Sequence, residues 1–118
     1  MNNLDYILNS LSKSKFRSRF YLNDKMITYV REKGIDKIRQ DAYELINKRL
    51  KPAFPLNDGK QTPMKQVHPV FIAQHACACC CRNCLEKWHH IKKGKELNDN
   101  EVNYIVNLLI KWIEIKCK

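Results

Sequence analysis

Apolar residues recur at helical spacing over three stretches in the first half of the chain. Residues 4–11 carry them three and four positions apart, which is the period of an amphipathic helix. Asn23 precedes the second stretch as an N-cap residue, and Gly34 follows it where a left-handed C-cap residue is favoured. The third pattern runs over residues 35–50 and stops at Pro52. We therefore expect three helices before residue 52.

The second half predicts a long loop followed by more helices. The four prolines fall within residues 52–69, together with an Asn57-Asp58-Gly59 turn signal. Pro69 suits the first position of a helix that runs into a cysteine-rich segment. Asn98 and Glu101 then form a capping-box pattern ahead of a wide apolar helical face.

No segment shows a convincing strand pattern, so we expect an all-α fold. This would be a small single-domain helical fold of about five helices, with a long proline-rich loop and a Cys/His-rich kinked helix. The 118 residues suffice for one compact domain and are too few for two. We expect one domain over residues 1–118, in which a basic helical half (1–51) precedes the proline-rich loop (52–69). The Cys/His segment and the C-terminal helix complete it (70–118).

The sequence lacks the signals of a membrane or secreted protein. No apolar run approaches the roughly 20 residues of a bilayer span, and the first residues do not resemble a secretory signal. We therefore expect a cytoplasmic protein with no membrane partner. In the reducing cytosol, six cysteines serve more often as metal ligands or buried apolar residues than as disulfides.

The charge balance indicates a polyanionic partner. Lysine and arginine number 22 against 12 acidic residues, a formal net charge of +10. Basic residues alternate over residues 13–19 with Phe16 and Phe20 between or beside them, and they share one side only if the segment is extended. We expect DNA or RNA to contact Lys13, Lys15, Arg17, Arg19, Lys60 and Arg82. The alternatives are that the charge serves solubility alone, or that the partner is a protein.

Five of the six cysteines and three of the four histidines lie within residues 75–90. Two Cys-x-x-Cys spacings are nested there, at residues 77–80 and 81–84. In a straight helix, positions 77 and 84 are about 10 Å apart along the axis, too far for all four sulfurs to bind one zinc ion. A closed site therefore requires a break near residues 76–80, with a second helix that begins near Cys80 and ends by His89. The predicted ligands are His75, Cys80, Cys81, Cys84 and His89, with His68 as a spare.

Several functions remain open for this segment. Mixed cysteine and histidine ligands favour zinc, and an iron–sulfur cluster is the alternative cofactor. The same cysteines would also suit a buried helix face without metal. A closed four-ligand site would be structural, whereas an open one would suit a metal-dependent hydrolase or nuclease that uses His75 or His89. Thiol redox chemistry is disfavoured because no βαβ unit surrounds the motif.

Four segments form a pattern over nearly the whole chain: Ser14–Phe20, Lys60–Met64, His68–Ala76, and Cys80–Arg82 with Cys84–His89. The pattern resembles a small bacterial and phage family, the domain of unknown function 4186. The family has no assigned activity, so the resemblance implies no catalytic role. The family-typical positions are those of Cys80, Cys81, Cys84, His75 and His89, whereas Cys77, Cys79 and His90 depart from the family pattern. The resemblance thus implies a mixed Cys/His set instead of a four-cysteine cluster.

The sequence therefore predicts a small basic zinc-binding protein with a structural Cys/His site and a nucleic-acid-binding surface. Two alternatives remain: a metal-dependent hydrolase or nuclease, and a metal-free helical protein-interaction module.

Overall fold

The computed structural model describes residues 3–118, and over this range the regular elements are all helical. Six α-helices and one 3-10 helix follow one another: α1 (Asn3–Ser12), η1 (Arg17–Arg19), α2 (Asp24–Lys33), α3 (Ile35–Arg49), α4 (Pro69–Ala76), α5 (Arg82–His89) and α6 (Asp99–Lys116). The predicted all-α class is confirmed. The α-helices are six instead of about five because the kinked helix consists of two separate helices, α4 and α5.

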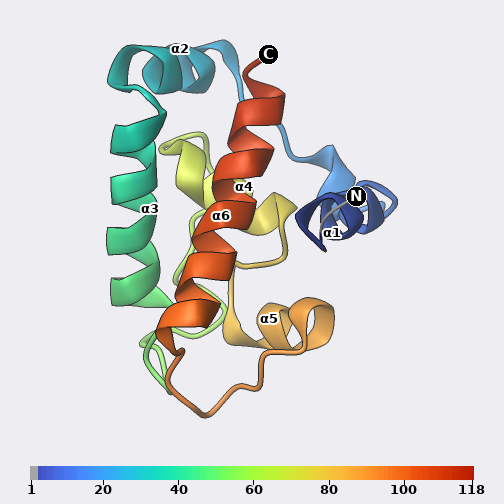
Figure 1. Cartoon of the computed structure of the whole chain (residues 1–118), viewed down its shortest axis with the longest axis vertical. Helices are drawn as coiled ribbons and strands as arrows, with labels where there is room; N and C mark the ends of the chain where they lie inside the picture. The colour runs from blue at the N-terminus through green and yellow to red at the C-terminus, as the bar shows by residue number, and fades with distance from the viewer. Residues whose placement is uncertain (1–2) are drawn as a thin grey trace.

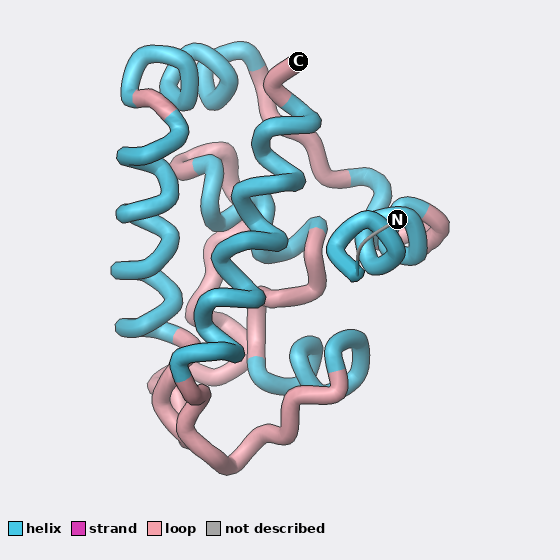
Figure 2. The backbone as a smooth tube through the Cα atoms, in the orientation of Figure 1, coloured by secondary structure: helices cyan, strands magenta, loops and turns pink. Residues whose placement is uncertain are grey.

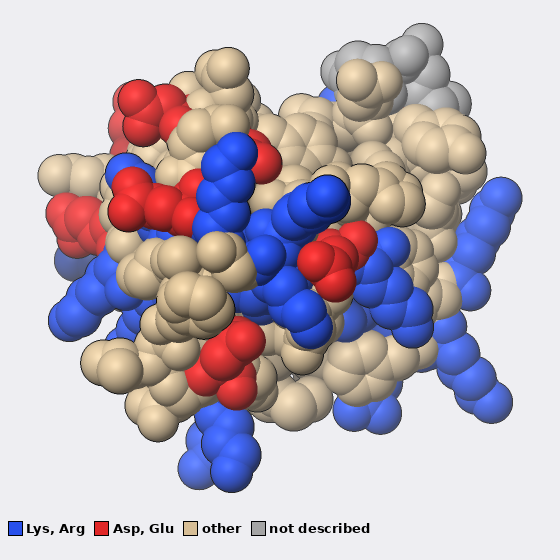
Figure 3. Space-filling model, turned by 90° about the horizontal axis from the view of Figure 1, so that it is seen from below, with Lys and Arg blue, Asp and Glu red and all other residues tan. Residues whose placement is uncertain are grey.

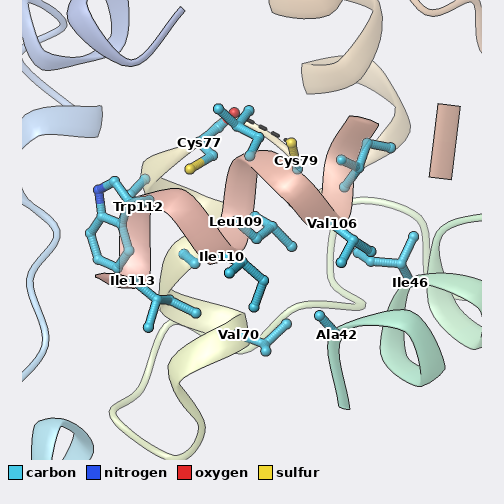
Figure 4. Close-up of a cluster of buried hydrophobic side chains, with 14 of the residues drawn as sticks. Ala42, Ile46, Val70, Cys77, Cys79, Val106, Leu109, Ile110, Trp112 and Ile113 are labelled. Carbon is cyan, nitrogen blue, oxygen red and sulfur yellow. Dashed lines mark hydrogen bonds between the residues drawn. The ribbon is translucent and has the colours of Figure 1, made fainter. Parts of the chain in front are cut away.

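Helix α6 occupies the middle of the molecule, and α1, α3 and α4 pack against it (Figure 1). Its inward face is the apolar stripe predicted from the sequence: Ile105, Val106, Leu109 and Ile113 are fully buried. Figure 4 shows this stripe meeting Val70 of α4 and Ala42 and Ile46 of α3. None of the described helices is long and apolar enough to cross a membrane, α6 included.

The helix ends follow the capping residues read from the sequence. The Asn23 side chain accepts a hydrogen bond from the Met26 backbone N–H at the start of α2. At the start of α6, Asn98 and Glu101 form both bonds of a capping box. Helix α4 begins with Pro69, as predicted, and the preceding His68 side chain caps it.

The two long loops, residues 50–68 and 90–98, meet at the lower end of the molecule (Figure 2). The Leu97 N–H donates a hydrogen bond to the Lys51 carbonyl, which joins them directly. Arg82 joins them more firmly, because its guanidinium donates to four backbone carbonyls, those of Leu50, Pro52, Lys92 and Lys95, at 2.7–3.3 Å. The expected phosphate contact at Arg82 is therefore corrected: its side chain is 1% exposed and holds loops together.

Residues 13–20 do not form the extended segment that would align their charges. Ser14 and Arg17 start a turn that continues into η1, where the Ser18 N–H donates to the Ser14 carbonyl. A helical turn sends neighbouring side chains in different directions. Lys15 and Arg19 consequently face solvent, while Arg17 turns inward.

Candidate metal centre

The break between α4 and α5 gathers three thiols. Ala78 adopts a left-handed conformation (φ 57°) directly after α4, and the Cys79 N–H returns to the Gln74 carbonyl, so the chain reverses there. Cys80 lies in this link, Cys81 is the N-cap of α5, and Cys84 lies in the first turn of α5. We call Cys80, Cys81 and Cys84 the thiol trio. The predicted helix break is confirmed, and it places sulfurs together that a straight helix would spread apart.

The spacing within the thiol trio suits a metal ion. The Cys84 sulfur lies 3.5 Å from the Cys80 sulfur and 3.1 Å from the Cys81 sulfur, and the three lie within 4.8 Å of one another. A tetrahedral zinc ion with bonds of about 2.3 Å separates its sulfur ligands by about 3.8 Å. The Cys84 sulfur would need to move away from the other two by less than about 1 Å, so the trio can hold a metal ion.

Arg17 of η1 lies directly on the thiol trio. Its guanidinium donates to the Cys80 sulfur at 3.5 Å, to the Cys84 sulfur at 3.2 Å, and to the His75 carbonyl at 2.7 Å. The side chain is 9% exposed, so its charge is available to the thiols and withdrawn from solvent. The structure thus corrects the expectation that Arg17 contacts nucleic acid, because its donors are already used inside the molecule.

The three thiols of the trio differ in their pKa values. Hydrogen bonds from Cys80 and Cys81, aided by the Arg17 guanidinium, hold the pKa of Cys84 well below its usual range, although burial opposes them. Hydrogen bonding to Cys81 and Cys84, together with burial, raises the pKa of Cys80. For Cys81, the hydrogen bond with Cys80 lowers the pKa, but the one with Cys84 and burial outweigh it. Without metal, the lowered pKa of Cys84 favours a thiolate there, beside two thiols and an arginine.

The two predicted histidine ligands are not within the trio. The His75 Nε2 lies 3.0 Å from the Thr62 carbonyl and 3.2 Å from that of Pro63, and Phe20 stacks on its ring. A carbonyl only accepts, so the proton lies on Nε2 and leaves Nδ1 as the acceptor nitrogen. Burial lowers the pKa of His75, which favours this neutral form.

His89 has both ring nitrogens engaged. Nε2 lies 2.8 Å from the Cys77 carbonyl, and Nδ1 lies 2.8 Å from the Tyr104 hydroxyl. Because the carbonyl accepts, Nε2 donates to it and Nδ1 accepts from Tyr104. Burial also lowers the pKa of His89. His89, at the end of α5, therefore contacts α6 through Tyr104. The sulfur that it approaches is that of Cys79, 3.6 Å from Nε2, and not one of the trio.

The model of the family described as domain of unknown function (DUF4186) matches residues 5–114. The chain belongs to the DUF4186 family. No solved structure matches it. The family match extends from α1 to α6 and includes the thiol trio and Arg17.

The other cysteines of this DUF4186 chain lie apart from the trio. Cys77 and Cys79 are fully buried beside α6 (Figure 4), where burial raises the pKa of each. These two cysteines therefore fit the alternative interpretation, in which cysteines fill the core as buried apolar residues. Cys117 follows the end of α6 and is half-buried.

The remaining predicted residues of the DUF4186 chain are dispersed. His68, the spare ligand, caps α4 through Nδ1 and lies 3.2 Å from an Asp41 carboxylate oxygen through Nε2. Lys13, Lys15, Arg19 and Lys60 are exposed. The sequence interpretation missed the position of Arg17 over the thiols, because no local signal separates one buried arginine from the exposed basic residues around it.

Proposed function

We propose that this chain is a zinc-binding protein in which the ion has a structural role. The observation that carries the proposal is the thiol trio together with its buried counter-charge. Three thiolates around Zn²⁺ carry a net charge of −1, and Arg17 lies within hydrogen-bond distance of two of the sulfurs to balance it. Zinc suits three sulfurs and one nitrogen, whereas most iron–sulfur clusters take four cysteines.

The fourth ligand that we propose is His75 through Nδ1. Zinc-bound histidines almost always donate their other ring N–H to a carbonyl or carboxylate, which fixes the ring. His75 already makes this bond through Nε2 to Thr62 and Pro63, whereas both nitrogens of His89 are occupied. Binding would bring the His75 ring toward the sulfurs and complete a Cys₃His site.

A structural role follows from what the site would join. The trio spans the break between α4 and α5, and Arg17 attaches η1 to the same point. A four-ligand site leaves no open position for a reacting water molecule, which is the feature of catalytic zinc. Keeping three thiols reduced fits the cytoplasm, where we propose the protein works.

The test is metal content with matched variants. Native mass spectrometry and elemental analysis should find one zinc ion per chain. Cys84→Ser should lose the ion and melt at a sharply lower temperature, whereas Cys117→Ser, far from the trio, should keep both. His75→Gln should weaken zinc binding, and His89→Gln should leave the metal content unchanged. A fully stable, metal-free protein would refute the proposal.

We also propose that the protein binds nucleic acid, because η1 and the turn before it present basic residues beside aromatic rings. Lys13, Lys15 and Arg19 are exposed, and the Arg19 guanidinium stacks over Phe16 at 4.7 Å. Phosphate contacts of this kind make affinity fall steeply with salt. The triple change of Lys13, Lys15 and Arg19 to Ala should lower both the affinity and its salt dependence. An affinity that does not change with salt concentration would contradict this proposal.

A further inference from the structure

Large apolar side chains are exposed along one edge of the molecule. Within residues 52–67, Phe54 is 81% exposed and Leu56 88%, and Met64 is also exposed. Tyr21, which follows η1, is 62% exposed. Gln66 connects the loop to this segment, because its side chain donates to the Tyr21 carbonyl and accepts from the Asn23 N–H. Exposed apolar groups gathered on adjoining segments mark an interaction surface.

The two segments that carry these side chains are strongly basic. Residues 13–21 contain four basic residues and no acidic one, and residues 48–67 contain five basic residues with Asp58 as the one acidic residue. Figure 3 shows basic side chains spread across the lower end of the molecule, with separate acidic groups among them. A partner that covers Phe54 and Tyr21 must therefore carry negative charge.

Two hollows in the surface adjoin the loop. One hollow, of about 480 Å³, is lined by Phe54, Pro63 and the basic residues Lys48, Arg49 and Lys60. The other, of about 510 Å³, is lined by Met64, Lys65, Arg19, Phe20 and Tyr21. Each therefore combines an aromatic ring with basic side chains, and residues 61–66 of the loop supply part of the lining of both.

We propose that this edge binds single-stranded nucleic acid, with bases stacked on Phe54 and Tyr21 and phosphates at Lys60, Lys65 and Arg19. The inference rests on the proposed nucleic-acid function and gives its substrate class. Unpaired bases expose the flat faces that aromatic side chains stack on, while a duplex hides them. An acidic peptide would satisfy the charges but offers no repeating flat groups for rings this exposed. Since stacking and phosphate contacts are common to DNA and RNA, both should bind alike.

The experiment measures fluorescence anisotropy of labelled oligothymidine and oligouridine strands of about 20 nucleotides, which is longer than the roughly 4–16 nucleotides that a single-strand site covers. The full chain should bind both strands at least tenfold more tightly than a duplex of equal length. Phe54→Ala and Tyr21→Ala should each weaken binding about tenfold at fixed salt. Lys60→Ala and Lys65→Ala should each reduce the slope of log affinity against log salt by about 0.7.

Matched controls lie elsewhere on the surface. Tyr6→Ala removes a ring that is equally exposed on α1, and Lys33→Ala removes an exposed charge at the end of α2; both should leave binding unchanged. Equal affinity for duplex, or unchanged binding in Phe54→Ala and Tyr21→Ala, would overturn the inference while leaving a general nucleic-acid function intact. Binding to phosphatidylserine vesicles without binding to any oligonucleotide would overturn both. Zinc content, measured in parallel, reports on the metal proposal separately.

Discussion

Two arginines are buried in this molecule, and each is stabilised in a different way. Arg17 faces sulfur atoms, one of which is a thiolate whose pKa is held well below its usual range. Arg82 faces backbone carbonyls. Burial lowers its pKa, although the negative charges of Asp58 and Glu101 oppose this by raising it. A buried charge needs such partners because its loss of hydration costs several kcal/mol.

We expect Arg82→Met to be strongly destabilising. The change would leave four carbonyls without their donor and would release the two loops that Arg82 joins. Urea unfolding should show a loss of about 3–5 kcal/mol in the free energy of unfolding. Lys87→Met, at an exposed position of the same helix, is the control and should change it by less than about 0.5 kcal/mol. A small effect at Arg82 would mean that the loops hold together without it.

Zinc binding should release about two protons at neutral pH. Cys84 is already a thiolate, while the raised pKa values of Cys80 and Cys81 keep both protonated until the metal displaces their protons. Zinc affinity should therefore fall as pH falls. Calorimetric titration in buffers of different ionisation enthalpy gives the count directly. Release of about three protons would show that Cys84 is protonated before metal binds.

The sequence identified the thiols of the site but not the position of the histidines. Cys80, Cys81 and Cys84 are close in sequence, so their convergence needed only the helix break that small residues at 76–80 suggested. The histidine rings depend on distant partners, Thr62 for one and Tyr104 for the other. Spacing along the chain carries no information about such contacts. The burial of Arg17 against the thiols could not be predicted for the same reason.

The helices were predictable because the sequence signals that start and end them are local. Asn23 and Asn98 mark the starts of α2 and α6 through bonds that span three residues. Gly34 ends α2 with a φ of 83°, which glycine adopts without strain. The turn around η1 was less predictable, because it is fixed by the contact of Arg17 with residues more than 50 positions away. The alternation of basic residues over 13–19 did not show which backbone conformation this segment adopts.

The end of α5 offers a stabilising substitution. His90 is an exposed residue in the left-handed conformation (φ 58°), which costs a non-glycine residue about 1–2 kcal/mol. After the greater flexibility of glycine in the unfolded chain is subtracted, His90→Gly should raise the free energy of unfolding by about 0.5–1 kcal/mol. Lys87→Gly, inside α5, should instead lower it by about 1 kcal/mol. A loss of zinc from His90→Gly would contradict the ligand set proposed above.

The proposed metal centre lies beside the packed core and not within it. Helices α3, α4 and α6 bury Ala42, Val70 and Leu109 against one another without help from the trio. The centre instead connects the α4–α5 break with η1 through Arg17. Metal should therefore control the order of these peripheral segments more than the existence of the fold.

Hydrogen exchange followed by mass spectrometry tests this division. Removal of zinc with a chelator should speed exchange at residues 14–20 and 77–84, because the metal–ligand bonds that brace the α4–α5 break and its contact with η1 are lost. Amides of α3 and α6 should stay protected, since their bonds lie in the apolar core. Uniform loss of protection over the chain would mean that the metal is required for the core itself.

The central position of α6 bears on how the protein is made. Helices α1, α3 and α4 all pack on α6, yet α6 follows all three along the chain and is therefore synthesised after them. Until residues 99–116 emerge, α1, α3 and α4 lack the α6 surface against which they pack, and short isolated helices are marginal in water. We therefore expect the nascent chain to stay loosely ordered until α6 is synthesised, and to fold cooperatively once it is.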